Sequence, residues 1–214
     1  RLIRPDVILA PNGADWQHIQ RSRPAPGELP PSDLQTIIER DKPLVGYSGA
    51  LAEWFDYELL TYVALARPDL EFVLVGVDYD GSLARSGVLD LANVHWLGLK
   101  SYDELFHYVW RFSLGMIPFK VNAITLATSP VKQFEYMACG LPVVATPLPE
   151  CRRFPEVLIA EEPAQFARRL DEAIRLKEDN LYQAAIARLA QENTWDNRAA
   201  ALEAALRGCQ GYPA

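Results

Sequence analysis

The chain has 214 residues, of which 50% are hydrophobic and 23% are charged, and its formal net charge is −7. This length accommodates one large domain or two small ones, and the hydrophobic share excludes a mainly disordered protein. Because the chain is acidic and has no block of lysines and arginines, nucleic-acid binding is excluded as its main role. A phosphate group could still be held by a local device such as the N-terminus of a helix.

The cysteines and the start of the chain indicate the setting of the protein. Cys139, Cys151 and Cys209 are far apart and form neither a C-x-x-C pair nor a zinc-ligand pattern, which is typical of a reducing compartment. We therefore expect a cytoplasmic protein. No apolar run approaches the roughly 20 residues that span a bilayer. The chain opens at Arg1 without a signal peptide, and we interpret it as a piece of a longer protein.

Short apolar runs alternate with amphipathic stretches along the chain. The runs predict strands at 7–10, 43–49, 71–76, 94–98, 114–118, 141–145 and 157–160. The amphipathic stretches predict helices near 32–38, 56–66, 102–110 and 129–139, and two or three more between 163 and 208. The proline-rich segment 21–32 predicts a surface connection.

Strands without polar alternation, each followed by a helix, predict a parallel sheet that is covered on both faces. The predicted fold class is therefore α/β, with a doubly wound, Rossmann-like parallel sheet. Ligands of such sheets bind at the carboxyl ends of the strands. This rule places the candidate residues in the loops 46–56, 76–87, 98–102 and 119–132.

The first of these loops contains the glycine turn Gly46-Tyr47-Ser48-Gly49. It matches neither the G-x-G-x-x-G dinucleotide fingerprint nor a P-loop, so a NAD enzyme and a P-loop NTPase are both disfavoured. Two interpretations of Gly49 remain open at this point. It either serves a tight turn that needs a positive φ, or it allows a ligand to approach the backbone closely.

The segment 128–140 carries the most chemical information. Ser129 and Pro130 are favourable N-cap and N1 residues, so the backbone N–H groups of Val131 and Lys132 would form an anion site at the start of a helix. Lys132 adds a full positive charge there. Glu135, one turn later, could accept hydrogen bonds from ribose hydroxyls. The alternative is an exposed Lys–Glu pair of little energetic value.

Residues 129–146, Ser-Pro-Val-Lys-Gln-Phe-Glu-Tyr-Met-Ala-Cys-Gly-Leu-Pro-Val-Val-Ala-Thr, resemble the donor-binding signature of retaining glycosyltransferases with the GT-B fold, of the group 1 or family 4 type. Other segments resemble the same family in the same order. They are Ala10-Pro11-Asn12-Gly13-Ala14-Asp15, Val45-Gly46-Tyr47-Ser48-Gly49-Ala50, Asn93-Val94-His95-Trp96-Leu97-Gly98, and Trp195 with the helix after it. The resemblance therefore covers nearly the whole chain.

The resemblance implies the C-terminal half of a transferase that moves a sugar from a nucleotide diphosphate sugar to an acceptor, with retention. It implies a UDP- or GDP-sugar as donor substrate, no other cofactor and no metal, and an N-terminal acceptor-binding domain of the same enzyme as partner. Polysaccharide biosynthesis is a typical setting of the family, and peripheral contact with the inner face of a membrane stays open. We expect a linker strand and turn over 1–20, the donor-binding domain over 21–193 and a C-terminal helix over 194–214.

The resemblance also assigns roles to individual residues. Lys132 and Glu135 are the implied catalytic residues: Glu135 binds the ribose, and Lys132 with the backbone of Ser129, Pro130 and Val131 holds the diphosphate. The backbone at Leu97 and Leu99 contacts the base, and Gly49 lets the donor approach. Lys120 and Asn122 are candidate phosphate or sugar contacts, with ordinary solvated loop residues as the alternative.

Two departures from the family pattern leave other functions open. The loop 50–54 lacks the cations that many relatives place there, and Ala127 stands where many have a second carboxylate. Both departures fit a non-catalytic nucleotide-binding module of the same fold. A third alternative is a sugar-nucleotide epimerase, which would need acid–base carboxylates and a histidine near the donor loops.

Overall fold

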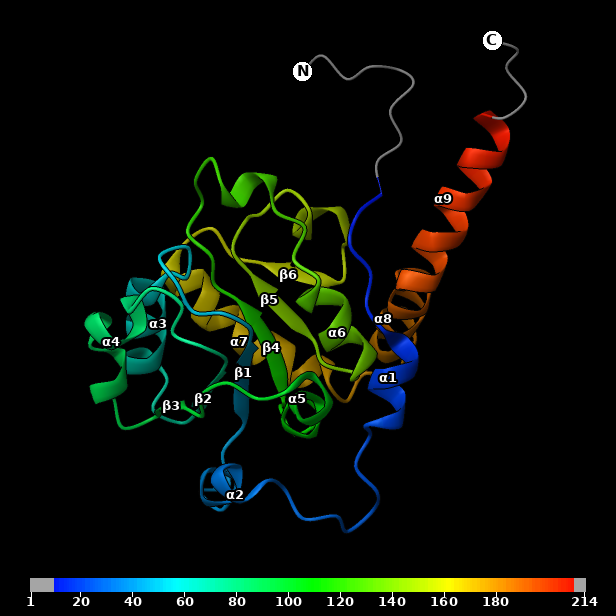
Figure 1. Cartoon of the computed structure of the whole chain (residues 1–214). Helices are drawn as coiled ribbons and strands as arrows, with labels where there is room; N and C mark the ends of the chain where they lie inside the picture. The colour runs from blue at the N-terminus through cyan, green and yellow to red at the C-terminus, as the bar shows by residue number, and fades with distance from the viewer. Residues whose placement is uncertain (1–9, 210–214) are drawn as a thin grey trace.

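A computed structural model of the chain describes residues 10–209, and it confirms the predicted α/β class. One sheet of six parallel strands runs in the order β3-β2-β1-β4-β5-β6 (Figure 1). The strands are β1 Leu44–Ser48, β2 Glu71–Val75, β3 Val94–Trp96, β4 Leu114–Ile117, β5 Val143–Ala145 and β6 Val157–Ile159. All six lie within predicted runs. Of the strand predicted at 7–10, residues 7–9 lie outside the described part and Ala10 is not in a strand.

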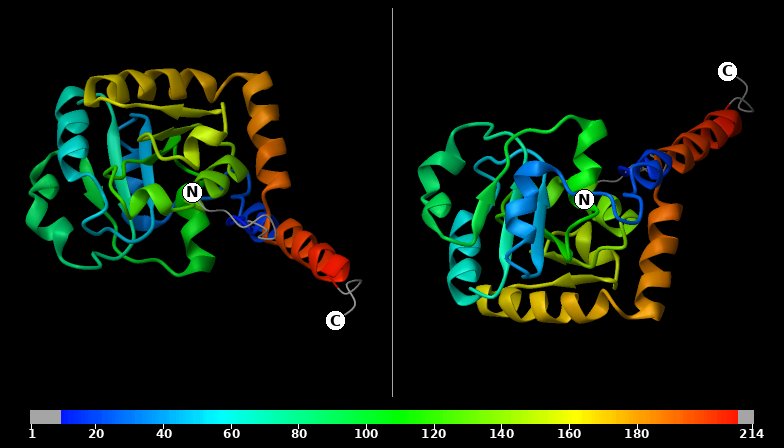
Figure 2. Two further views of the ribbon diagram at one scale, coloured as in Figure 1. Left: turned by 90° about the horizontal axis from the view of Figure 1, so that it is seen from above. Right: turned by 90° about the horizontal axis from the view of Figure 1, so that it is seen from below.

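Helices cover both faces of the sheet. The structure has α1 Trp16–Arg21, α2 Ser32–Ile38, α3 Tyr57–Ala66, α4 Ser82–Ser86, α5 Tyr102–Val109, α6 Lys132–Ala138, α7 Pro163–Leu176, α8 Asn180–Glu192 and α9 Trp195–Cys209. Short 3-10 turns occur at Val88–Asp90, Thr125–Ala127 and Cys151–Arg153. Helices α3 and α7 pack together on one face, and α5 and α6 contact the strands from the other, whereas α9 leads away from the sheet (Figure 2). No described helix is both long and apolar enough to cross a bilayer.

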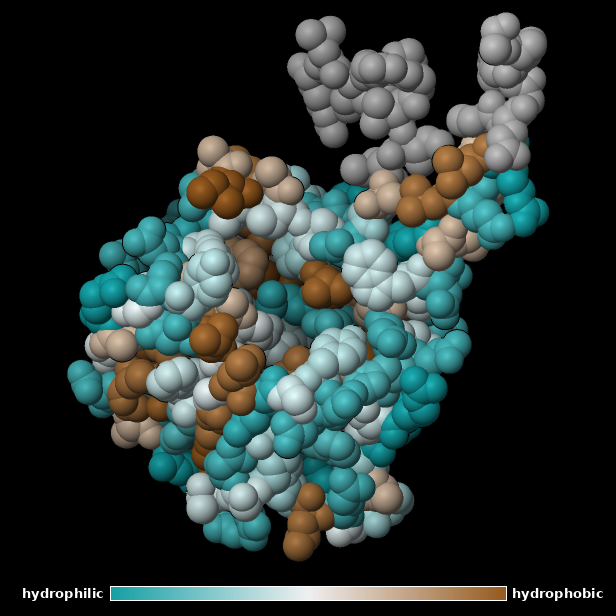
Figure 3. Space-filling view, in the orientation of Figure 1, coloured by the Kyte–Doolittle hydropathy of each residue, from teal (hydrophilic) through white to brown (hydrophobic). Residues whose placement is uncertain are grey.

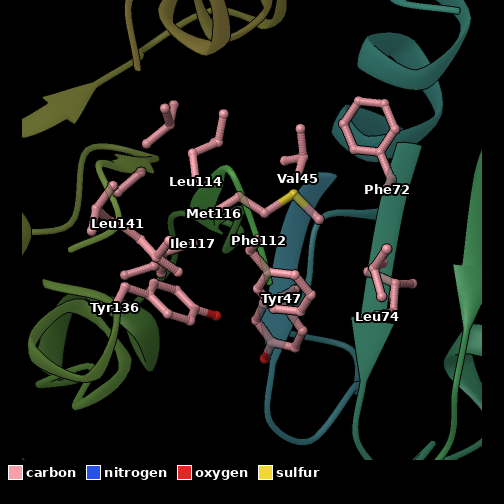
Figure 4. Close-up of a cluster of buried hydrophobic side chains, with 14 of the residues drawn as sticks. Val45, Tyr47, Phe72, Leu74, Phe112, Leu114, Met116, Ile117, Tyr136 and Leu141 are labelled. Carbon is pink, nitrogen blue, oxygen red and sulfur yellow. The ribbon is translucent and has the colours of Figure 1, made fainter. Parts of the chain in front are cut away.

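The sheet carries the core because its central strands are buried on both faces. Every residue of β1, β2 and β4 is buried, as the absence of polar alternation in their sequences predicts. Figure 4 shows part of this core, in which Phe112 and Tyr136 lie close to the strand side chains. Tyr136 comes from α6, and Phe112 is the third residue after the end of α5.

Two glycines on neighbouring strands make room for these rings. Gly46 of β1 and Gly115 of β4 are register partners. A Cβ atom on Gly46 would lie 1.9 Å from the ring of Phe112, and a Cβ atom on Gly115 would lie 2.2 Å from the ring of Tyr136. The hydroxyl of Tyr136 accepts a hydrogen bond from the backbone N–H of Ser48 at 2.8 Å. These contacts fix α6 against the ends of β1 and β4.

The start of α6 differs from the prediction. The helix begins at Lys132, and Ser129 does not cap it. Instead, Ser129 is engaged by Asn12, whose side-chain N–H₂ donates to the Ser129 carbonyl oxygen at 2.7 Å and whose backbone N–H donates to the Ser129 hydroxyl at 3.4 Å. Asn12, 117 residues away in sequence, therefore engages Ser129, whose hydroxyl the local sequence predicts as the cap of the helix.

Two short helices, α1 and α4, are absent from the predicted elements. Asp15 caps α1 by accepting a hydrogen bond from the backbone N–H of His18 at 2.9 Å. The predicted cap of α3 is confirmed, since Asp56 accepts from the backbone N–H of Leu59 at 2.9 Å. The chain just before α1 joins the start of α9: Ala14 donates to the carbonyl of Asn193 at 2.9 Å and accepts from the N–H of Trp195 at 3.1 Å.

We predict that Gly46→Ala destabilises the fold by about 1–3 kcal/mol or more, because its methyl group would overlap the ring of Phe112. The free energy of unfolding in urea measures this loss. The same substitution in a Phe112→Leu background should cost less, because the smaller side chain can yield. Equal costs in the two backgrounds would contradict the proposed overlap.

Candidate functional site

The order of the strands changes direction between β1 and β4. The chain winds outward in one direction from β1 and in the other from β4, which makes this the switch point where doubly wound sheets bind ligands. The loops after these strands are fastened together. The backbone N–H of Asp56 donates to Pro118 at 2.8 Å, and that of Lys120 donates to Trp54 at 2.8 Å. The switch point is therefore bordered by two loops that are hydrogen-bonded to each other.

Gly49, the residue after β1, forms part of this border. Its φ is +133°, and its N–H donates to the carbonyl of Val75 at 2.8 Å, so the interpretation as a turn with positive φ agrees with the structure. The neighbouring Gly76 has a φ of +153°, and a Cβ atom there would lie 1.9 Å from the Gly49 carbonyl oxygen. The two turns therefore pack backbone against backbone, which leaves the side facing α6 open.

Lys132 occupies that side. A Cβ atom on Gly49 would lie 3.3 Å from its Nζ, and Nζ lies 5.2 Å from the ring centres of both Tyr47 and Phe119. Within residues 10–209, no carboxylate oxygen comes within 4 Å of this ammonium group. Burial lowers the pKa of Lys132, and the charge of Glu135 opposes the shift. The ammonium group thus lies beside the glycine loop that itself lacks a cation, without a carboxylate partner.

Glu135 lies one turn further along α6 and is 9% exposed. Burial raises the pKa of its carboxyl group, and the charge of Lys132 opposes the shift. Tyr102 is near enough to respond to this carboxylate: burial, together with the charges of Glu135 and Asp15, raises the pKa of Tyr102 to about 12. The alternative of an exposed Lys–Glu pair, which sequence alone left open, is thus wrong, because Glu135 is buried and Lys132 is partly buried.

The backbone N–H groups at the start of α6 can also donate to a ligand. Val131 has helical dihedrals of −59° and −32°, and its carbonyl accepts from the N–H of Phe134 at 2.9 Å. Pro130, which has no N–H, accepts from Gln133 at 3.4 Å. In the described structure, the N–H groups of Val131 and Lys132 have no acceptor. Two backbone donors and one ammonium group therefore lie at the start of the helix.

The remaining predicted residues lie around this group rather than in it. Leu99 is exposed and lines a small hollow of about 90 Å³ with Gly49. Leu97 lines another hollow beside Trp96, and its N–H donates to Leu74 at 2.9 Å. The side chain of Lys120 lines a hollow with Glu53.

Asn122 has a local structural role. Its side-chain oxygen accepts from the backbone N–H groups of Ile124 at 2.9 Å and Thr125 at 3.1 Å, which shapes the loop after β4. The structure therefore brings together Gly49, Val131, Lys132 and Glu135, but it does not bring Lys120, Leu97 or the Asn122 side-chain oxygen to them.

Sequence reasoning missed an aromatic group beside Glu135. Tyr102 is 46% exposed, and His18 stacks on it with ring centres 4.8 Å apart. The only local signal was that Tyr102 starts a helix directly after a strand-end loop. Among the described side chains, no three His, Cys, Asp or Glu residues are grouped as metal ligands would be.

Comparison with known proteins assigns the family. A family model described as glycosyl transferase-like matches residues 58–204. The chain belongs to this glycosyltransferase family. It is 26% identical over 199 residues to TuaH of Bacillus subtilis (strain 168), which is named as a candidate glycosyltransferase of teichuronic acid biosynthesis. That match covers 90% of this chain and 49% of TuaH.

Solved structures place the fold in the same group. A Burkholderia multivorans trehalose 6-phosphate synthase aligns with a TM-score of 0.68 and 15% identity, over 94% of this chain and 50% of that one. Anabaena HepE, solved in complex with UDP and glucose, aligns with a TM-score of 0.64 and 18% identity, over 94% and 56%. The fold is that of the C-terminal half of a GT-B glycosyltransferase, as the resemblance implied. The chain spans about half the length of these relatives.

We predict that Glu135→Gln changes how stability depends on pH. The raised pKa means that folded protein binds this proton more tightly than unfolded protein, so the wild type loses stability as pH rises from the usual 4.5 through the raised value. The variant lacks this loss. Its free energy of unfolding relative to wild type should therefore increase from about pH 4 to about pH 7.

Urea unfolding across this pH range measures the difference. The exposed Glu178→Gln, on the segment after α7, is the control for the loss of one carboxylate. A relative stability of Glu135→Gln that is flat or decreases with pH would contradict a buried carboxylate whose ionisation is costly.

Proposed function

We propose that this chain is the donor-binding part of a glycosyltransferase that transfers a sugar from a nucleoside diphosphate sugar. One observation carries the proposal. The Lys132 ammonium group lies at Gly49 without a carboxylate partner among the described residues, next to the available N–H groups of Val131 and Lys132. A partly buried cation and backbone donors at a switch point are suited to an anion, and a diphosphate can bind all of them.

The same groups would support departure of the leaving diphosphate. Negative charge develops on the leaving oxygens as the bond to the sugar breaks, and a cation in a partly dehydrated site stabilises it strongly. Lys132 would supply this charge at the cation-free loop 50–54, since its Nζ lies beside Gly49. The departure at 50–54 from the family pattern is thus compatible with catalysis, and we retain sugar transfer with retention as the proposed reaction.

Glu135 is the proposed ribose ligand. A carboxylate accepts hydrogen bonds from two neighbouring hydroxyls, and this one is held one turn behind the proposed phosphate site. Bound ribose hydroxyls would favour the charged form of Glu135, which burial alone disfavours. UDP and GDP both contain the ribose hydroxyls and the diphosphate, so these contacts serve either nucleotide. The complex of HepE with UDP and glucose supports UDP.

The binding site for the acceptor would come from outside this chain. We propose an N-terminal acceptor-binding domain as partner, because the chain spans about half of its relatives. The name of TuaH supports polysaccharide biosynthesis. We propose the cytoplasm as the place of the sugar transfer, as the scattered cysteines led us to expect. The loop after β4 exposes Val121, Ile124 and Leu126, and Figure 3 shows apolar side chains gathered on this projecting loop. This surface suits contact with the acceptor-binding domain or with the periphery of a membrane.

We predict that the chain binds one of UDP, GDP, ADP and dTDP in calorimetric titration, and that Lys132→Met and Glu135→Ala each weaken this binding by roughly ten- to a hundredfold. This is the loss expected when one charge-assisted contact is removed. The exposed Arg168→Ala, on α7, is the control and should bind as wild type does.

Unchanged affinity in Lys132→Met would contradict the phosphate assignment, and unchanged affinity in Glu135→Ala would contradict the ribose assignment. The absence of nucleotide binding by the folded chain would contradict the proposal that this chain holds the donor site by itself.

A further inference from the structure

A second hollow, with a volume of about 600 Å³, lies at the opposite edge of the sheet. Its lining comes from the ends of α5 and α6, which precede β4 and β5, and from α1, α8 and the segments after α1 and α7. Figure 1 shows α1 beside α6 and α8 in this region. The hollow is within the usual size range of sites for small molecules. Nothing in the proposed donor site uses it.

The lining of this hollow is positively charged. It includes Arg23, Arg111 and Lys177, and its described lining residues include no aspartate or glutamate. This is unexpected in a chain whose net charge is −7. None of the three cations forms an ion pair within the described part of the chain. Their charges are therefore not cancelled by protein carboxylates in direct contact.

The hydrogen bonds of these cations leave donors free. Lys177 Nζ donates to the carbonyl of Gly140 at 3.1 Å, and one terminal nitrogen of Arg111 donates to the carbonyl of Glu28 at 2.6 Å. The Nε of Arg111 is buried and has no acceptor among residues 10–209. Because this atom is enclosed by protein, a ligand in the hollow would be bound by the terminal nitrogens of Arg111.

Arg23 adds an ordered guanidinium group on the exposed side. It lies over the ring of Trp110, 5.2 Å from the ring centre, which restricts its orientation. Burial lowers the pKa of Lys177, the charges of Cys139 and Glu178 oppose this shift, and the positive charge of Arg23 adds to it. Arg23 and Lys177 both line the hollow, so an anion between them would offset their mutual repulsion.

We propose that this hollow binds the phosphate group of a small phosphorylated compound. The guanidinium of Arg23 offers a planar pair of donors that matches phosphate oxygens, and the terminal nitrogens of Arg111 and the Lys177 ammonium group add further donors. The total of three positive charges suits a doubly charged anion. Trp16 and Trp110 provide apolar wall for the organic part of the ligand. The carbonyl of Ala138 at the end of α6 accepts from the side chain of Gln20 at 2.7 Å, so it is already satisfied.

This phosphate site is separate from the proposed donor site. Lys132 begins α6 at the carboxyl edge of the sheet, whereas Ala138, Cys139 and Gly140 at its other end line the hollow. Seven residues of helix separate the two ends by roughly 10 Å. The proposal does not rest on the chain being a glycosyltransferase.

Titration of the ¹⁵N-labelled chain with inorganic phosphate at constant ionic strength tests the site. The indole N–H signals of Trp16 and Trp110 should shift and saturate. Trp96 and Trp54 lie at the other edge, and their signals report separately on phosphate that binds there. Arg23→Gln should weaken binding roughly three- to tenfold, because the guanidinium is exposed and partly screened. Exposed Arg168→Gln is the matched control and should bind as wild type does.

Glucose, which is neutral, should leave the two signals unchanged. Saturable shifts of Trp54 without shifts of Trp16 and Trp110 would overturn the proposal, because they would assign phosphate to the carboxyl edge. The proposal would also be overturned by non-saturating shifts, by equal affinity in Arg23→Gln and wild type, or by the same response to glucose. Because Arg23 is exposed, its substitution should leave the fold intact, and Arg111→Gln gives a second variant at the buried donor.

Discussion

The pairing of Gly46 with Gly115 positions the rest of the candidate site. Because neither residue has a side chain, the rings of Phe112 and Tyr136 can press directly onto the two central strands. Tyr136 then reaches the end of β1 with its hydroxyl group and accepts from Ser48. This seat fixes the position of α6. Lys132, one turn before Tyr136, thereby comes to lie at Gly49, so the proposed donor site depends on space left by a glycine on another strand.

The molecule contains two clusters of charged side chains, and only one of them is neutralised by contacts within the protein. At the amino end of β2, buried Glu71 contacts Arg40 and Lys42, each at 3.2 Å, and His95 at 2.6 Å. The protein's own side chains therefore neutralise that carboxylate, and His95 is one of its contacts. Within the part of the chain that the structure describes, Lys132 and Glu135 have no such partners, and burial disfavours the charged form of each. Groups that remain costly in the free protein are those that a bound ligand can satisfy, which is the arrangement expected of a preorganised site.

Much of the fold could be predicted from the sequence because its signals are local. Uninterrupted apolar runs such as Leu44–Ser48 encode buried parallel strands, and Asp56 caps the helix that its position predicts. The start of α6 could not be predicted, since Asn12 engages Ser129 from a distant part of the chain. Lys132 and Glu135 were found because both lie on one helix. Tyr102 and the phosphate hollow were missed because residues from separate segments form them, and no local spacing records such contacts.

A crystal structure of the chain with bound UDP tests the central claim, that the start of α6 holds the nucleotide, most directly. The account predicts diphosphate oxygens within hydrogen-bond distance of the Val131 and Lys132 N–H groups and of Lys132 Nζ. It also predicts that the ribose hydroxyls contact Glu135. A nucleotide bound elsewhere, with Lys132 still free beside Gly49, would contradict it.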